Sequence, residues 1–151
     1  MRVIICGNRN WHDLSLIEQI MVSLPKDTVI IEGECRGADL LAKRVAEKNG
    51  YIVIPCPADW QKYGNAAGPI RNQKMLDEYK PDLVLAFHND IEHSKGTKDM
   101  IIRADKANIP VRIIGENNKE WIYDSEHKEF IDISCDNPKL RKLLKESVKI
   151  K

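Results

Sequence analysis

The sequence predicts an α/β fold with a five-stranded parallel sheet. Over residues 1–114, short runs of apolar and β-branched residues alternate with segments whose apolar residues follow helical spacing. Such alternation is typical of a parallel sheet that is covered by helices on both faces. A length of 151 residues and a formal net charge of +1 fit one domain of this class with a substantial core.

The first two predicted strands flank an amphipathic helix. Arg2–Cys6 is almost entirely apolar and predicts a buried strand. Asp13 can cap a helix, because its carboxylate accepts hydrogen bonds from the free amides of a first turn, and Pro25 ends that helix. Thr28–Glu32 is rich in β-branched residues and predicts the second strand.

The next segments predict a helix, a strand, a loop and another helix. Ala38–Asn49 has an apolar face at helical spacing, and the strand Tyr51–Pro55 follows it. Cys56–Gly68 is polar and predicts a long loop, which a compact domain seldom keeps without a role. Pro69–Tyr79 predicts a helix, because proline is favoured at the first helical position.

The last part of the alternating pattern predicts two more strands. Asp82–Phe87 is the fourth strand and Val111–Ile114 is the fifth. Between them, the polar loop His88–Lys95 precedes a helix that Thr97 can cap. The loops after parallel strands lie at one edge of the sheet, where folds of this class bind ligands.

Residues 115–151 follow a different pattern and predict an extension of the domain at 1–114. Glu120–Asp124 and Glu129–Ile133 predict a β-hairpin, and Asn137-Pro138 opens a short helix. The leucines of that helix can pack on the domain or on a second copy of the chain. These leucines are Leu140, Leu143 and Leu144.

The composition excludes several classes of protein. No apolar stretch is long enough to cross a membrane, and Met1-Arg2 leads directly into a strand rather than a signal peptide. The four cysteines form no C-x-x-C pair and the four histidines show no metal-ligand spacing. We therefore expect a cytoplasmic protein with reduced thiols and with no metal or cofactor. Basic residues are spread along the chain, which argues against a nucleic-acid partner.

Three glycine-bearing loops follow predicted strands and can form one anion site. Gly7-Asn8-Arg9 ends the first strand, and its arginine offers a fork of donors to phosphate. Gly33 begins the loop after the second strand. Lys95-Gly96-Thr97 opens a helix whose amides and threonine hydroxyl can hold phosphate, although alone it also fits an ordinary glycine turn.

Other polar and aromatic residues are candidates for binding a ribose or a base. Gly37 lets the N-terminus of the next helix approach a ligand closely, and Asp39 either binds a ribose hydroxyl or only caps its helix. In the long loop, Trp60 or Tyr63 can stack on a base, and Asp59 can accept a hydrogen bond from a base or ribose. The alternative is that the aromatic residues only hold this loop to the core.

Arg71 is the arginine most expected to face a ligand. It lies in the predicted first turn of a helix, where the helix dipole disfavours a cation unless an anion is present. Asn72 beside it offers both a donor and an acceptor. The alternative is a solvated Arg71. No nucleophile with its base can be identified from spacing.

These motifs resemble the YspA-like, cpYpsA-related branch of the SLOG superfamily over residues 1–114. The matching residues are Gly7-Asn8-Arg9-Asn10-Trp11, Gly33 with Gly37-Ala38-Asp39, Pro57-Ala58-Asp59-Trp60, Tyr63-Gly64, Ala67-Gly68-Pro69-Ile70-Arg71-Asn72, Leu83–Phe87 and Lys95-Gly96-Thr97. The usual opening is Gly-Ser-Arg, so Asn8 is a departure. The resemblance implies a Rossmann-like three-layer fold that binds nucleotides or ADP-ribose-type signals, in a phage or bacterial protein that handles signalling nucleotides.

One branch of the superfamily, the Lonely Guy phosphoribohydrolases, implies an enzymatic alternative. These enzymes release a base from a nucleoside monophosphate, and their signature is an arginine at a helix start with a Gly-Thr-x-x-Glu segment. Arg71 matches the arginine, and Gly96 and Thr97 match the second motif. Met100 stands at the glutamate position, and Asp99 lies one residue early. A methionine cannot act as an acid or a base.

Three functions therefore remain open. The first is a sensor or sequestering protein that binds a nucleotide-derived ligand, as a homodimer or higher homo-oligomer. The second is an N-glycosidic hydrolase in which Arg71 steadies the phosphoribosyl group and Asp39, Asp59 or Asp99 supplies the carboxylate. The third is a binder of single-stranded nucleic acid, against which the near-neutral charge argues.

Overall fold

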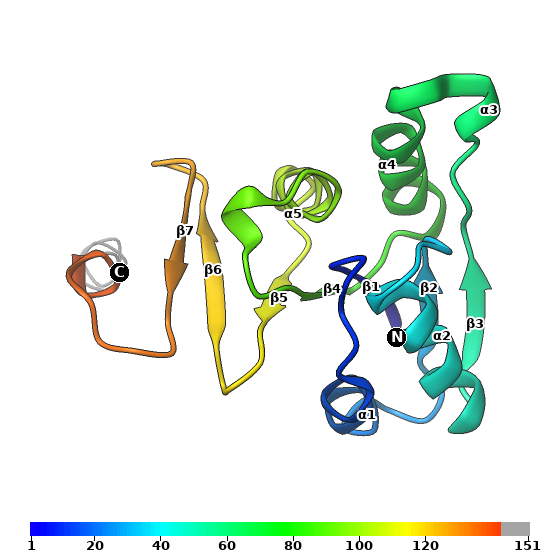
Figure 1. Ribbon diagram of the computed structural model, residues 1–151, viewed down its shortest axis with the longest axis horizontal. Coiled ribbons are helices and arrows are strands. Elements are labelled where there is room, and N and C mark those ends of the chain that lie inside the picture. The colour runs from blue at the N-terminus through cyan, green and yellow to red at the C-terminus, as the bar shows by residue number, and fades with distance from the viewer. Residues whose placement is uncertain (143–151) are drawn as a thin grey trace.

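The computed structural model of the protein describes residues 1–142 and contains one seven-stranded sheet in the order β3-β2-β1-β4-β5-β6-β7 (Figure 1). The strands are β1 (Arg2–Gly7), β2 (Val29–Glu32), β3 (Ile52–Pro55), β4 (Leu83–Phe87), β5 (Val111–Ile114), β6 (Glu120–Asp124) and β7 (Glu129–Asp132). The helices are α1 (Leu14–Met21), α2 (Ala38–Lys48), α3 (Trp60–Tyr63), α4 (Ala67–Tyr79) and α5 (Gly96–Lys106). Strands β1 to β5 are parallel, which confirms the predicted sheet.

Helices cover the parallel part of the sheet on both faces. α1 and α2 lie on one face, while α4 and α5 lie on the other (Figure 1). Alternate residues of β1 supply the two cores. Ile5 packs with Ile17 and Val45 on the α1 and α2 side, and Ile4 packs with Met75 and Met100 on the other side. This arrangement confirms the Rossmann-like three-layer architecture.

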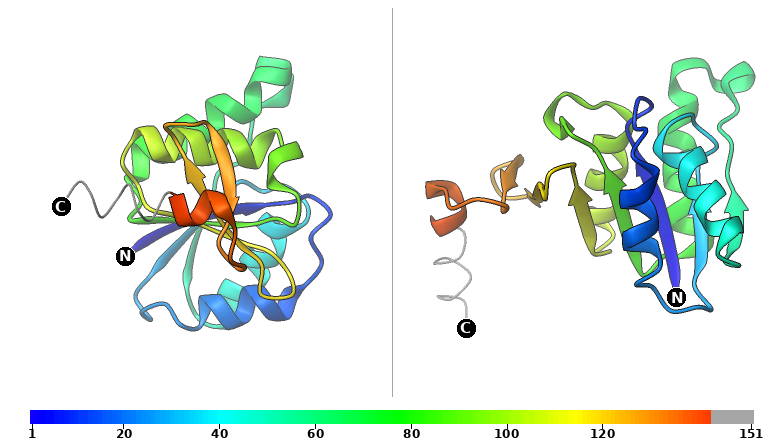
Figure 2. Two further views of the ribbon diagram at one scale, coloured as in Figure 1. Left: turned by 90° about the vertical axis from the view of Figure 1, so that its left-hand side faces the viewer. Right: turned by 60° about the horizontal axis from the view of Figure 1, so that its bottom comes forward.

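The predicted count of five strands is wrong, because the hairpin of β6 and β7 continues the same sheet. β6 pairs antiparallel with β5, with Ile113 opposite Trp121, and β7 pairs with β6 (Figure 2). Phe130 of β7 packs with Ile101 of α5 and with Ile91, which precedes that helix. The hairpin therefore covers the edge of β5, whose amides and carbonyls would otherwise lack partners.

The chain after β7 turns into a helix at Asn137. The side-chain oxygen of Asn137 accepts a hydrogen bond from the amide of Leu140 at 2.7 Å, which is a helix cap. Leu143 and Leu144 lie outside the described residues, so the predicted packing of these leucines stays a prediction. The boundary between 1–114 and 115–151 also stays a prediction. Within residues 1–142, no helix has the length and apolar character needed to cross a membrane.

The segment after β3 is more ordered than the predicted loop. Asp59 caps α3, because its carboxylate accepts a hydrogen bond from the amide of Lys62 at 3.0 Å. A 3₁₀ turn at Gly64–Ala66 leads into α4, which begins two residues before the predicted Pro69. Proline is tolerated there because the amides of a first helical turn have no partner within the helix.

Candidate functional site

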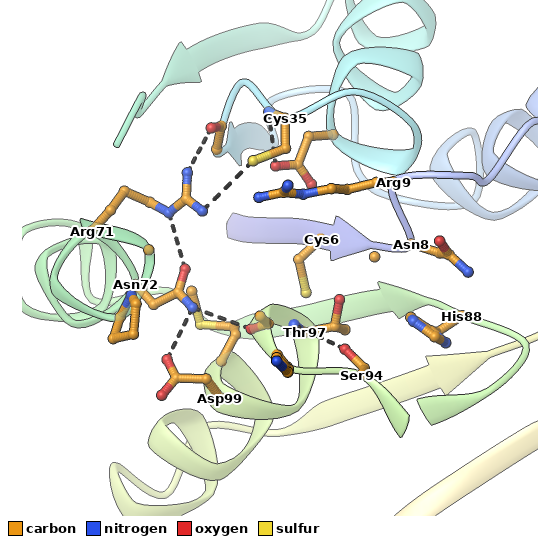
Figure 3. A pocket seen from close by; sticks show the side chains of 18 of the residues that line it. Cys6, Asn8, Arg9, Cys35, Arg71, Asn72, His88, Ser94, Thr97 and Asp99 are labelled. Carbon is orange, nitrogen blue, oxygen red and sulfur yellow. Dashed lines mark hydrogen bonds between the residues drawn. The ribbon is translucent and has the colours of Figure 1, made fainter. Parts of the chain in front are cut away.

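A cavity of about 850 Å³ opens where β1, β2 and β4 end (Figure 3). It lies at the carboxyl edge of the sheet, where the sequence places the pocket. The predicted residues that line it are Gly7, Asn8, Arg9, Gly33, Asp39, Trp60, Arg71, Asn72, Lys95, Gly96, Thr97 and Asp99, and Met100 lines it as well. Among the described residues, Gly37 and Asp59 were also predicted, and they lie outside its lining.

Gly7 and Gly37 serve the packing of loops against one another. A Cβ atom on Gly7 would lie 2.2 Å from the carbonyl oxygen of Phe87, and one on Gly37 would lie 2.2 Å from that of Asn8. The amide of Ala38 donates to the same Asn8 oxygen at 3.1 Å. The N-terminus of α2 therefore contacts the loop after β1, and the role predicted for Gly37 in ligand binding stays a prediction.

Replacing Gly37 with alanine is expected to cost more stability than the same change at Gly50. Both residues have a positive φ, +83° and +78°, so both variants pay about 1–2 kcal/mol for that backbone conformation. Only at Gly37 does the new methyl group meet another backbone, since a Cβ on Gly50 has nothing within 4 Å. We expect an additional loss of about 1–3 kcal/mol at Gly37, measured by urea unfolding. Equal losses in the two variants would contradict this role of Gly37.

Arg71 binds backbone carbonyls from two loops. Its Nη1 donates to the carbonyl of Gly33 at 2.6 Å and to that of Cys56 at 3.2 Å, and its Nε donates to Asn72 Oδ1 at 3.0 Å. A Cβ on Gly33 would lie 2.4 Å from this Nη1, so a side chain at position 33 would displace the guanidinium group. Arg71 thus ties α4 to the loops after β2 and β3, and places a positive charge in the cavity wall. It is not the solvated arginine of the alternative interpretation.

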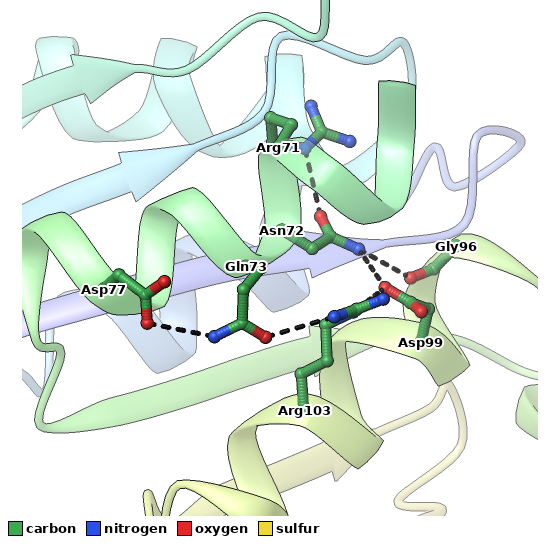
Figure 4. A network of polar contacts seen from close by, with 7 residues as sticks. All are labelled: Arg71, Asn72, Gln73, Asp77, Gly96, Asp99 and Arg103. Carbon is green, nitrogen blue, oxygen red and sulfur yellow. Dashed lines mark hydrogen bonds and ion pairs between the residues drawn. The ribbon is translucent and has the colours of Figure 1, made fainter. Parts of the chain in front are cut away.

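Asn72 connects Arg71 to a network between α4 and α5 (Figure 4). Its Nδ2 donates to Asp99 Oδ2 at 3.0 Å and to the carbonyl of Gly96 at 3.3 Å. Arg103 donates to the same Asp99 oxygen at 2.8 Å. Since Asp99 is paired with a cation and an amide, it holds the two helices together, and its Oδ2 atom already has two donors.

Asp39 is a buried carboxyl in the cavity wall. It is 6% exposed and lies in the first turn of α2, where it accepts a hydrogen bond from the amide of Cys35 at 3.3 Å. Burial raises the pKa of Asp39 to about 6, although the positive charge of Arg71 and the Cys35 amide oppose that rise. Asp39 is therefore the carboxyl in the cavity that can change its charge near neutral pH.

Ser94, which the sequence interpretation missed, accepts hydrogen bonds from two amides in the first turn of α5. Its Oγ accepts hydrogen bonds from the amides of Thr97 at 3.2 Å and Lys98 at 3.3 Å. The prediction that Thr97 caps this helix is therefore wrong, because Thr97 lies inside the helix. Serine is a favoured cap, and this preference could have identified Ser94. A Cβ on Gly96 would meet nothing within 4 Å, so the space beside its Cα atom is open.

Trp60 of α3 lines the cavity. It is 46% exposed, and the guanidinium carbon of Arg9 lies 5.8 Å from the centre of its ring. Tyr63 is 40% exposed and lies outside the cavity lining. The exposure of both rings contradicts the alternative in which they hold the loop to the core. Trp60 offers a π surface at the cavity mouth.

The sequence interpretation also missed Arg36 and His88. Arg36 is exposed and lines the cavity beside Cys35, and the glycine loop that contains it was the available signal. The Nδ1 of His88 accepts a hydrogen bond from the amide of Asp90 at 2.9 Å. Burial lowers the pKa of His88, so the ring is neutral near pH 7 and offers its Nε2 proton. No signal in the sequence distinguished His88 from the other histidines.

Comparison with known proteins gives consistent results. Residues 1–63 match the YspA, cpYpsA-related SLOG family. Gene 61 protein of Mycobacterium phage D29 is 35% identical over 124 residues, which cover 76% of this chain and 97% of that protein. The X-ray structure of DNA processing protein A from Streptococcus pneumoniae is similar in fold, with a TM-score of 0.60, 18% identity, and coverage of 75% of this chain. The match spans 50% of that longer chain. The protein belongs to the YspA, cpYpsA-related SLOG family.

Proposed function

We propose that the cavity binds a nucleotide or a nucleotide-derived ligand such as an ADP-ribose-like molecule, and that the protein senses or sequesters it. The observation that carries this proposal is a group of three cations, Arg9, Arg36 and Lys95, around the cavity. Within residues 1–142, none of the three side chains has a carboxylate partner. Unpaired cations that line a concave site attract phosphate.

The remaining parts of the cavity suit a nucleoside. The exposed ring of Trp60 at the mouth offers a surface on which a base can stack. Asp39 lies inside the cavity, where its carboxylate can accept hydrogen bonds from ribose hydroxyls. A site with phosphate, ribose and base contacts matches the nucleotide-related ligands of the family.

The placement of the carboxylates favours binding over hydrolysis. Asp59 is outside the cavity lining and caps α3. Asp99 is held by Asn72 and Arg103. Met100 is 1% exposed and has no acidic group. Of the three carboxylates proposed for hydrolysis, Asp39 is the one in the cavity lining that has no ion-pair partner among the described residues.

An N-glycosidic hydrolase is the second candidate, because Asp39 has a pKa near 6 and lies in the cavity with Arg71. To separate the two functions, the protein is incubated with AMP, ADP-ribose or NAD, and chromatography measures the released base or nicotinamide. Under the binding proposal the ligand stays intact and raises the melting temperature. Turnover that disappears in Asp39→Asn would instead establish the hydrolase.

Arg9→Gln tests whether this cavity is the binding site. Arg9 is exposed, so the variant is expected to fold as the parent does and to lose about tenfold or more in affinity for the stabilising nucleotide. The matched control is Arg44→Gln, which removes an exposed arginine of α2 outside the cavity and should bind normally. Equal nucleotide binding by both variants would place the site elsewhere. An oligonucleotide affinity that falls steeply as the salt concentration rises would favour a nucleic-acid ligand.

A further inference from the structure

We propose that the ligand of this cavity carries two linked phosphate groups and that Arg36 is one of the residues that bind them. This inference rests on the proposed nucleotide-binding function and narrows it to nucleoside diphosphates and pyrophosphate-linked dinucleotides. Three features support it: the places of the three unpaired cations in the fold, the state of the nearby carboxyl groups, and the open backbone at Gly96.

The three cations come from loops that follow three neighbouring strands. Arg36 follows β2, Arg9 follows β1 and Lys95 precedes α5 after β4, and these strands lie side by side in the order β2-β1-β4. Neighbouring strands are about 4.8 Å apart, so the loops start from a row about 10 Å long. Charge-assisted hydrogen bonds to phosphate are about 2.7–2.9 Å long. Two linked phosphates can extend along such a row. A single phosphate would have to draw all three cations close together.

The carboxyl groups in the cavity do not neutralise these cations. Asp99 is paired with Arg103, at 2.8 Å. The charge that acts most strongly on Asp39 is that of Arg71, and that of Arg9 has a smaller effect. Three cations that share one cavity without a partner repel one another, and a ligand with several negative charges removes this repulsion.

The open backbone at Gly96 gives one end of the row a further anion contact. A Cβ on Gly96 would have no atom within 4 Å, and this residue begins α5 next to Lys95. The N-terminus of a helix carries partial positive charge from its amides. The phosphate nearer β4 therefore lies at Lys95 and Gly96, and the phosphate nearer β2 lies at Arg36.

The test compares AMP with ADP, and inorganic phosphate with pyrophosphate, on the full chain by titration calorimetry and thermal shift. We expect ADP to bind at least about tenfold more tightly than AMP, and pyrophosphate to stabilise more than phosphate. In Arg36→Gln the preference of the protein for ADP over AMP should shrink to about twofold, while Arg44→Gln should keep it. Both arginines are exposed, so both variants are expected to fold.

The outcomes separate this inference from the function on which it rests. If AMP and ADP bind equally, or if Arg36→Gln keeps the preference for ADP, the cavity does not select two phosphates although it binds nucleotides. If neither nucleotide and neither inorganic anion binds, the proposed function fails together with the inference. If a dT oligonucleotide binds more tightly than ADP, the row of cations serves a nucleic-acid strand and the inference is overturned.

Discussion

Glu32→Gln is expected to raise the free energy of unfolding at pH 9 by about 2–4 kcal/mol and to leave it nearly unchanged at pH 5. Glu32 ends β2 and is fully buried. Its Oε1 has no hydrogen-bond partner among the described residues, while its Oε2 accepts from the amide of Glu34 at 2.5 Å. Burial raises the pKa of Glu32 to about 8; the Glu34 amide opposes this rise, and the carboxyl groups of Glu34 and Asp39 add to it.

The sign of this pH dependence follows from the two pKa values of Glu32. In the unfolded chain the carboxyl group ionises near its ordinary value of 4.5, whereas in the folded protein it stays protonated until about pH 8. The folded state thus holds the extra proton between these values, and stability falls as the pH rises through that window. Asp39 acts in the same direction between its ordinary 3.8 and about 6.

Urea unfolding of parent and variants at pH 5, 7 and 9 checks this expectation. Glutamine keeps the shape of the protonated carboxyl group and does not titrate, so the curve of Glu32→Gln should be flatter than that of the parent. Glu47→Gln is the matched control, because Glu47 is exposed on α2. If the difference in free energy of unfolding between Glu32→Gln and the parent is the same at pH 9 as at pH 5, Glu32 is not held protonated in the folded protein.

Arg71→Ala is expected to lower the free energy of unfolding by about 2–4 kcal/mol. The variant leaves the carbonyls of Gly33 and Cys56 without their donor and removes the positive charge that acts most strongly on Asp39. The pKa of Asp39 should therefore rise above its value in the parent, because the charge that opposes the effect of burial is gone. Chemical denaturation measures the first effect, and NMR titration of the Asp39 carboxyl measures the second.

Two further substitutions on α4 make this result specific. Arg71→Lys keeps the charge but cannot reproduce the fork of donors, so its stability should fall between those of the parent and Arg71→Ala. Lys74→Ala removes an exposed cation whose partner Glu78 lies 3.8 Å away, and it should change stability by less than about 0.5 kcal/mol. If Arg71→Ala proves as mild as Lys74→Ala, the contacts of Arg71 add little stability.

The sequence was sufficient to predict the parallel part of the fold. The strands β1 to β5 are short apolar runs, because both faces of a parallel sheet are buried, and this signal is local. The joining of the hairpin to β5 was not predictable in the same way. It depends on Phe130 meeting Ile91 and Ile101, which are distant in sequence. The start of α4 was misplaced because Ala67 and Gly68 carry no start signal and Pro69 does.

The convergence of the loops on one cavity was predictable, because parallel strands all end at the same edge of the sheet. The orientation of each side chain was not predictable. Arg71 faces the cavity wall because the carbonyls of Gly33 and Cys56 are nearby, and only the folded backbone places them there. Gly37 was predicted to let a helix approach a ligand, and in the structure it accommodates the loop of Asn8. A glycine in a loop does not reveal whether a ligand or another loop approaches it.

The two edge strands of the sheet bear on how copies of this protein can associate. β3 and β7 are each four residues long, β3 ends at Pro55, and β7 begins and ends with the acidic residues Glu129 and Asp132. Short edges that carry proline or charge resist pairing with strands of another molecule, which limits aggregation through the sheet. A homo-oligomer of this chain is therefore expected to form through side-chain contacts between helices, with each copy keeping its own sheet.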